Sequence, residues 1–263
     1  MDYVDEEVKE KRILFVADKN MSFASRSLLT ALKETKITID VAELSTTSLG
    51  AIYETPDLMI IDAADYMDGQ NTDVFEYVVD IARESEIKVG IIGYKEELDI
   101  ILQKMPTHLI ATLFTRPIDT NVTVKQIVDL VNFVADCDGK KHVLVVDDSG
   151  MMLRTVNSWL DGYYKVSLSN SAANAMKVLN TNKPDLILLD YEMPVCSGPQ
   201  FLENIRKEVL FRDIPVLFLT TKNDPESVKR VVQLKPAGYI LKTTPEEQVI
   251  QTIEDTLLKQ KGR

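Results

Sequence analysis

The chain has 263 residues and a formal net charge of −11, from 30 Lys and Arg against 41 Asp and Glu. This length suits two domains of common size, and 45% hydrophobic with 27% charged residues is a globular composition. An acidic surface repels phosphate groups, so we expect no direct nucleic-acid binding and no attachment to an anionic membrane. No apolar run reaches the roughly 20 residues of a membrane span, and the charged start lacks a signal core. We therefore expect a cytoplasmic protein.

Short apolar runs alternate with helical periodicity along the whole chain. We interpret residues 1–11 as a charged tail, 12–135 as a first domain, 136–141 as a short polar linker and 142–263 as a second domain. The strands predicted in the first domain are Ile13–Ala17, Thr38–Ala42, Leu58–Asp62, Val89–Gly93 and Ala111–Thr115. Those predicted in the second are Val143–Asp147, Tyr164–Ser169, Leu186–Asp190, Val216–Thr220 and Tyr239–Lys242.

Most of these runs are continuously rich in Val, Ile and Leu and lack a period of two. That pattern is typical of parallel strands covered on both faces by helices. Five strand–helix units in each half predict two α/β domains of the (βα)₅ type. The half-chains even share a line, "PDLMIID" at 56–62 and "PDLILLD" at 184–190. No G-x-G-x-x-G follows the first strand of either half, which argues against a dinucleotide site.

Polar residues end several strands of the second half. In a doubly wound sheet such strand ends face one crevice, where ligands bind. Three acids repel one another when brought together, and a divalent cation with oxygen ligands, Mg²⁺ in particular, would offset that repulsion. A nearby ammonium and hydroxyl would then suit a carboxylate that accepts a phosphoryl group. The residues concerned are Asp147, Asp148, Asp190, Thr220 and Lys242.

The second half resembles the response-regulator receiver family through "VLVVDDS", "PDLILLDYEMP" with Gly198 following, "IPVLFLTT" and "GYILK". The resemblance implies a flavodoxin-like fold with a five-stranded parallel sheet of order 2-1-3-4-5 in each domain. It implies that Asp190 is the phosphoacceptor, that Thr220 and Tyr239 switch on phosphorylation, and that Lys242 pairs with the phosphate. Mg²⁺ would be held by Asp147, Asp148, Asp190 and the backbone carbonyl of Glu192. Thr243 departs from the family, which often has proline there, and this leaves the placement of the following loop open.

The first half keeps the frame but loses part of the chemistry. Asp62 falls opposite Asp190, whereas Ala17 and Asp18 fall opposite Asp147 and Asp148, so that one acid is lost. Gly93 falls opposite the threonine and Arg116 opposite the lysine. We expect a degenerate pseudo-receiver in which Asp62 and Arg116 form a resting ion pair.

In the same half, Leu113 stands where the second domain has Tyr239. Asp65 and Asp68, from the segment after Asp62, are a less favoured alternative acid cluster.

The resemblance implies a two-component response regulator that receives phosphate from a sensor histidine kinase or a phosphotransfer protein. It would signal to a downstream protein through altered contacts, with a homodimer as one possible form. It would not be an enzyme beyond Mg²⁺-dependent self-phosphorylation and self-dephosphorylation. Three alternatives stay open: a phosphorylation-independent scaffold or adaptor, a hydrolase using the same acids, and the N-terminal regulatory part of a longer response regulator with an output domain.

Overall fold

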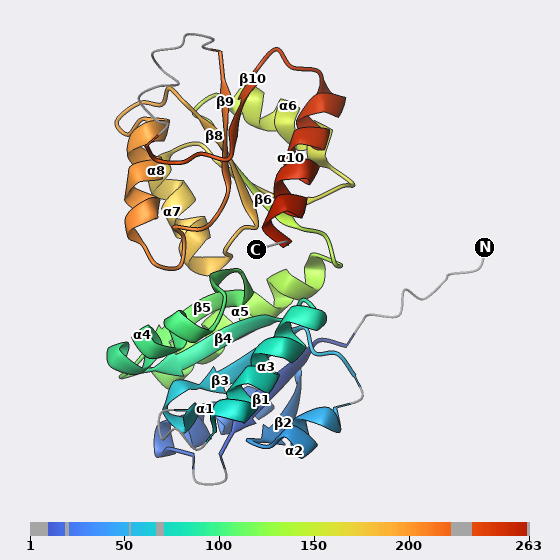
Figure 1. Cartoon of the computed structure of the whole chain (residues 1–263), viewed down its shortest axis with the longest axis vertical. Coiled ribbons are helices and arrows are strands. Elements are labelled where there is room, and N and C mark those ends of the chain that lie inside the picture. Colours follow the sequence, from blue (N-terminus) through green and yellow to red (C-terminus); the bar gives the residue numbers. More distant parts are fainter. Residues whose placement is uncertain (1–9, 19–20, 53, 67–70, 222–232, 262–263) are drawn as a thin grey trace, which may run out of the picture. The chain divides into compact units, whose positions relative to one another are not determined.

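The computed structural model describes residues 10–18, 21–52, 54–66, 71–221 and 233–261 (Figure 1). The chain divides into two compact units, one ending at Asp136 and the other starting at Cys137. Each unit holds its own five-stranded sheet, and every strand pairing is parallel. Each is described by itself below.

The first domain alternates strands and helices from its first described residues onward. Its elements are β1 (Arg12–Ala17), α1 (Phe23–Lys33), β2 (Thr38–Glu43), α2 (Thr46–Gly50), β3 (Leu58–Asp62), the 3₁₀ helix η1 (Ala63–Tyr66), α3 (Thr72–Glu84), β4 (Lys88–Gly93), α4 (Lys95–Lys104), the 3₁₀ helix η2 (Thr107–Leu109), β5 (Ile110–Thr115) and α5 (Thr120–Asp136).

The first sheet has the strand order β2-β1-β3-β4-β5. Every residue of β3 is buried, as the continuous apolar run "LMIID" predicts for a strand covered on both faces. Leu28 and Leu32 of α1 pack together with Ile127 and Val131 of α5 in one core cluster on the sheet. Their spacing of four residues places each pair on one helix face, so the amphipathic pattern directly determines which face is buried.

The second domain repeats the arrangement. Its elements are β6 (His142–Val146), α6 (Gly150–Leu160), β7 (Lys165–Ser169), α7 (Ala172–Thr181), β8 (Leu186–Asp190), α8 (Gly198–Lys207), β9 (Val216–Thr220), β10 (Gly238–Leu241) and α10 (Glu246–Lys261). The helix expected between β9 and β10 falls largely at 222–232, outside the described residues.

The second sheet has the order β10-β9-β8-β6-β7, which read from its own first strand is again 2-1-3-4-5. Helices α7 and α8 lie on one side of it and α6 and α10 on the other (Figure 1), with a separate apolar core under each pair. This is the doubly wound, flavodoxin-like order, and it confirms the fold class expected for both domains. None of the helices described here combines the length and hydropathy needed to cross a membrane.

The repeated Pro-Asp line has a structural role at the start of the third strand of each domain. The Asp57 carboxylate accepts a hydrogen bond from the backbone N–H of Arg12 at 2.9 Å, and the Asp185 carboxylate accepts one from His142 at 2.8 Å. In return, the Asp57 N–H donates to the Arg12 carbonyl at 2.9 Å, and the Asp185 N–H donates to the His142 carbonyl at 2.8 Å. These contacts satisfy backbone groups where two neighbouring strands begin. The shared line thus fastens the sheet at the edge away from the predicted crevice.

Candidate functional site

The acids of the second domain meet at the carboxyl edge of its sheet. Asp147 and Asp148 directly follow β6, and Asp190 ends the neighbouring strand β8. One carboxylate oxygen from each lies within 4.8 Å of the other two. Among the described residues this is the one group of three or more His, Cys, Asp or Glu side chains close enough to share a metal ion.

Burial divides the three acids. Asp147 and Asp190 are buried, at 1% and 5% exposure, whereas Asp148 is exposed. The backbone N–H of Ser149 donates to Asp147 at 2.9 Å and fixes the orientation of that carboxylate, while the Ser149 hydroxyl caps α6. The site therefore offers inner oxygen ligands held by the fold and an outer one beside solvent. Carboxylate oxygens with open water positions are the donor set that suits Mg²⁺.

Lys242 brings a positive charge to the same place. It directly follows β10, and its Nζ lies 2.6 Å from Asp147 Oδ2 and 3.1 Å from Asp190 Oδ1. Its own N–H donates to the Thr220 carbonyl at 2.8 Å. The residue after Lys242 is Thr243. With threonine there, the Lys242 ammonium group still contacts both acids.

The pKa values of both Asp190 and Lys242 are raised at this site. Burial and the neighbouring charge of Asp147 raise the pKa of Asp190 above its ordinary value, although the hydrogen bond from Lys242 opposes the shift. Burial lowers the pKa of Lys242, but hydrogen bonds to both carboxylates outweigh it and the pKa is raised. A further positive charge would stabilise the ionised acids, so the residues present fit a divalent cation.

Thr220 lies on β9, the neighbour of β8, and Tyr239 lies on β10, the edge strand beyond β9. Thr220 is buried at the end of β9, which pairs with β8. The Tyr239 ring stacks on Phe218 with centroids 5.4 Å apart, and its buried hydroxyl has no hydrogen-bond partner among the residues that the structure describes. Four predicted side chains therefore meet at the crevice, those of Asp147, Asp148, Asp190 and Lys242. Thr220 ends the neighbouring strand, and Tyr239 packs into the adjoining core.

Gly198 matters more than its sequence context suggests. Its N–H donates to the Tyr191 carbonyl at 3.1 Å, so α8 begins directly beneath the end of β8. A Cβ at this position would lie 2.2 Å from the Asp190 carbonyl oxygen and 3.0 Å from the Phe218 ring. Only glycine allows this approach, and the approach sets the backbone on which Asp190 and Glu192 lie.

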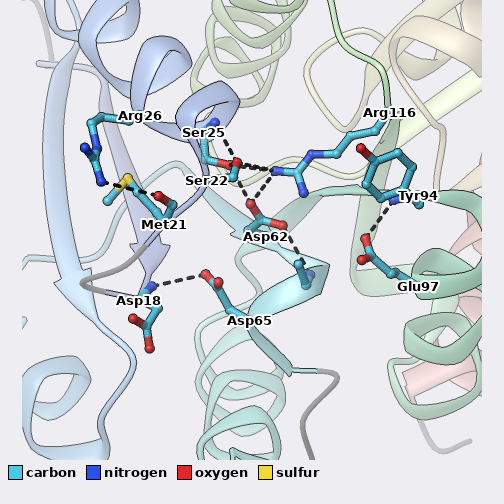
Figure 2. A network of polar contacts seen from close by, with 11 residues as sticks. Asp18, Met21, Ser22, Ser25, Arg26, Asp62, Asp65, Tyr94, Glu97 and Arg116 are labelled. Carbon is cyan, nitrogen blue, oxygen red and sulfur yellow. Dashed lines mark hydrogen bonds and ion pairs between the residues drawn. The ribbon is translucent and has the colours of Figure 1, made fainter.

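The first domain places Asp62 at the same point of its sheet, with different neighbours (Figure 2). Asp62 is 1% exposed, and its Oδ2 lies 2.5 Å from Arg116 Nη2 and 2.5 Å from the Ser25 hydroxyl. Arg116 also donates to Ser25 at 2.6 Å and to Ser22 at 3.3 Å. The expected resting ion pair between Asp62 and Arg116 is confirmed.

The first domain also differs from the second at Ala17 and Gly93. Ala17 is buried where the second domain has an acid, and the Asp18 backbone N–H donates to Asp65 at 3.1 Å. A Cβ on Gly93 would lie 2.8 Å from the Cβ of Ala63, so a threonine would not fit there. Asp65 therefore links the segment after β3 to the segment after β1, and Asp68, the other member of the alternative acid cluster, lies outside the described residues.

Ser22 and Ser25 are the site residues that the sequence analysis missed. A signal existed, because Ser25 shares a helix face with Leu28, Leu29 and Leu32, all buried. A serine in an otherwise apolar stripe needs a polar partner inside the protein. Here that partner is the Asp62 carboxylate.

Comparison with known proteins agrees with the geometry of the second domain. Residues 143–254 match the model of the response regulator receiver domain. The phosphate regulon transcriptional regulatory protein PhoB of Escherichia coli is 32% identical over 116 residues, which are 43% of this chain and 50% of that protein. A probable cyclic di-GMP phosphodiesterase of Vibrio cholerae is 33% identical over 100 residues, 38% of this chain and 23% of that one. The chain thus spans half or less of the length of these relatives.

Among solved structures, the chemotaxis protein CheY4 of Vibrio cholerae is 27% identical. The match covers 45% of this chain and 99% of that one, with a TM-score of 0.43.

Proposed function

Because the second domain is a response regulator receiver domain, we propose that it accepts a phosphoryl group on Asp190 from the phosphohistidine of a partner protein. The observation that carries this proposal is the contact of one ammonium, Lys242, with two buried carboxylates beside an exposed third acid. That arrangement lets a dianionic group approach a carboxylate without an unbalanced negative charge.

In the transfer, an Asp190 carboxylate oxygen forms a bond to phosphorus while the bond from phosphorus to the donor imidazole nitrogen breaks. The imidazole takes up a proton, and Asp190 becomes an acyl phosphate. Asp147, Asp148, Asp190 and the Glu192 carbonyl would hold Mg²⁺, which when bound neutralises charge on the phosphoryl oxygens. Lys242 would leave Asp147 for a phosphoryl oxygen.

Thr220 and Tyr239 would carry the change to the surface. Thr220 lies at the buried end of β9, and we propose that its hydroxyl bonds the new phosphoryl group. The Tyr239 ring on β10 stacks on Phe218 of β9, so a movement of β9 would also displace β10. The Tyr239 hydroxyl has no hydrogen-bond partner among the described residues that would hold it in place. The altered β9–β10 face would then change the contact with a downstream protein.

The partners follow from this role. We propose a sensor histidine kinase or a phosphotransfer protein upstream, a protein target downstream, and a cytoplasmic location. Homodimerisation through either domain is compatible with the role. We expect no catalysis beyond Mg²⁺-dependent self-phosphorylation and self-dephosphorylation, because the described residues of the site offer no further general base.

The boundaries expected from the sequence serve as the proposed domain organisation. Residues 12–135 form the pseudo-receiver, residues 136–141 the linker and residues 142–263 the receiver, after a tail at 1–11. The sealed Asp62 supports a phosphorylation-independent role for the first domain.

The test is labelling of the full chain with acetyl phosphate and Mg²⁺, read by intact mass and by the lability of the adduct to hydroxylamine. We expect one phosphoryl group on the wild-type chain, the same on Asp62→Asn, and none on Asp190→Asn. Labelling of Asp190→Asn at the wild-type level would refute the assignment of Asp190. Removal of Mg²⁺ with a chelator should abolish labelling.

A further inference from the structure

The cation of the first domain occupies its crevice in a way that the lysine of the second does not. Arg116 and Lys242 have equivalent backbone positions, since each N–H donates to the last carbonyl of the neighbouring strand, Gly93 at 2.9 Å and Thr220 at 2.8 Å. Among the residues that the structure describes, the Lys242 ammonium pairs with two acids, whereas the Arg116 guanidinium also binds two serine hydroxyls at the α1 start.

The contacts of Asp62 leave it little capacity for an outside ligand. One of its oxygens receives Arg116 and Ser25, and the other receives the backbone N–H of Ala64 at 3.2 Å. Figure 2 shows the guanidinium beside the Asp62 carboxylate and the serine hydroxyls, with contacts to both. The Arg116 side chain is 7% exposed, so it is a buried part of the domain.

Arg116 also reaches the start of α4. Its Cζ lies 5.9 Å from the centre of the Tyr94 ring, within range of a cation–π contact. Tyr94 is the residue before α4, its N–H donates to Glu97 at 2.8 Å, and its carbonyl accepts from Leu98 at 2.9 Å. A continuous series of contacts therefore links Asp62 to the first turn of α4 (Figure 2).

We propose that Arg116 is a built-in occupant of the Asp62 crevice. Its guanidinium supplies the positive charge that a metal would bring, and the Ser22 and Ser25 hydroxyls supply the hydrogen bonds that Gly93 cannot. Through Tyr94 this occupant holds the β4–α4 region in one conformation. The first domain thus keeps a fixed α4 face with neither metal nor phosphodonor.

The first experiment asks whether this region responds to a phosphoryl analogue. The full chain carrying Asp190→Asn is treated with beryllofluoride and Mg²⁺, and amide hydrogen exchange is measured peptide by peptide. We expect unchanged exchange from Lys88 to Lys104. Protection of these peptides by the analogue would overturn the proposal.

The same measurement on the chain with Asp190 intact separates this inference from the proposed function. If beryllofluoride does not change hydrogen exchange in the β9 and β10 peptides of that chain, the phosphoacceptor proposal fails. The Arg116 proposal is still decided by the exchange of the peptides from Lys88 to Lys104.

The second experiment removes the contact between the cation and α4 without disturbing the buried ion pair. In Tyr94→Leu we expect the amides from Leu98 to Ile101 to exchange roughly 10-fold faster, because the first turn of α4 loses its anchor. Tyr94→Phe keeps the ring and should exchange at the wild-type rate. Exchange in Tyr94→Leu equal to wild type would overturn the coupling.

Arginine variants complete the set. Arg116→Met should accelerate exchange across all of α4, while Arg83→Met, which removes an exposed arginine of α3, should leave α4 unchanged. Should Arg116→Met fail to fold, the Tyr94 pair still decides the question. Equal acceleration by both arginine variants would also contradict the proposal.

Discussion

The two domains present the same fold with a different cation at the same place. In the second, a lysine touches two acids of an open group of three, and burial with mutual repulsion raises the pKa of Asp190. In the first, an arginine and two serines surround a single buried acid, Asp62. The second site has one cation against three acids, whereas the single buried acid of the first is already bonded by the arginine and a serine of its own domain. A phosphoryl-transfer site depends on that deficit, because a metal and a phosphate can enter only where the protein has not already supplied their contacts.

The largest expected effect comes from breaking the satisfied site. Asp62→Asn leaves the Arg116 guanidinium buried without its anion, and such a loss costs roughly 3–5 kcal/mol of unfolding free energy. Urea denaturation followed by circular dichroism measures the first domain together with the second. The only tryptophan, Trp159 in α6, reports the second domain by fluorescence and should be unaffected.

The control for this change is Asp80→Asn, which removes an exposed acid paired with Arg83 and should change stability by less than about 0.5 kcal/mol. If Asp62→Asn were equally mild, the carboxylate would not be the partner that keeps Arg116 buried.

The next largest effect is expected when the lysine of the second domain is replaced by arginine, the cation of the first. Lys242→Arg should slow acyl-phosphate formation by roughly 100-fold, because a planar two-pronged guanidinium binds Asp147 and Asp190 together and fills the space for phosphate. Time courses with acetyl phosphate measure the rate. Lys259→Arg, at an exposed position of α10, is the matched control. Wild-type kinetics in Lys242→Arg would mean that the shape of the cation does not separate the two domains.

A smaller effect on stability is expected when a side chain is added at Gly93. Gly93→Ala places a methyl group 2.8 Å from the fixed Cβ of Ala63, and such overpacking costs about 1–3 kcal/mol. Gly150→Ala meets nothing closer than the mobile Arg154 guanidinium at 3.6 Å, so it should be neutral or slightly stabilising. Chemical denaturation compares the two. If Gly93→Ala left the free energy of unfolding unchanged, lack of space would not explain why this position has no threonine.

The smallest effect concerns Asp65, whose pKa is raised to about 6, chiefly by burial, from an ordinary value of 3.8. The folded state therefore holds this proton more tightly than the unfolded chain. The stabilisation is complete below pH 3.8 and is lost as the pH rises through about 6.

Asp65→Asn keeps an acceptor for the Asp18 N–H without a charge, so at pH 7 it should stabilise the first domain. We expect roughly 1 kcal/mol, reduced from the full shift because the group is only half buried. Denaturation at pH 7 and pH 4 measures it. A gain of equal size at both pH values would contradict ionisation as the cause.

Much of the fold could be predicted because burial on both faces leaves a simple pattern. The run "LILLD" has no alternation and became β8, buried at every residue. Strand limits shifted by at most one residue, as at β6, which ends at Val146 instead of Asp147. The pairing of Asp62 with Arg116 was also predictable, since equivalent strand ends meet in equivalent domains.

The serine contacts could not be predicted, because they depend on the exact length of a loop. Two more residues separate the strand end from the helix in the first domain, five at 18–22, than in the second, three at 147–149. The approach of Gly198 to Asp190 likewise follows from backbone geometry that no residue pattern encodes. Periodicity predicts which face is buried, but not which atoms meet there.

The paired aspartates Asp57 and Asp185 show how the two edges of one sheet answer to different demands. At the amino edge both domains keep the same carboxylate, joined to the same backbone groups of a neighbouring strand. At the carboxyl edge the aspartate that ends the third strand is kept, but Ala17, Gly93 and Arg116 stand where the second domain has Asp147, Thr220 and Lys242. Scaffolding and reactivity are therefore physically separable along a strand of five residues, and either could be redesigned without touching the other.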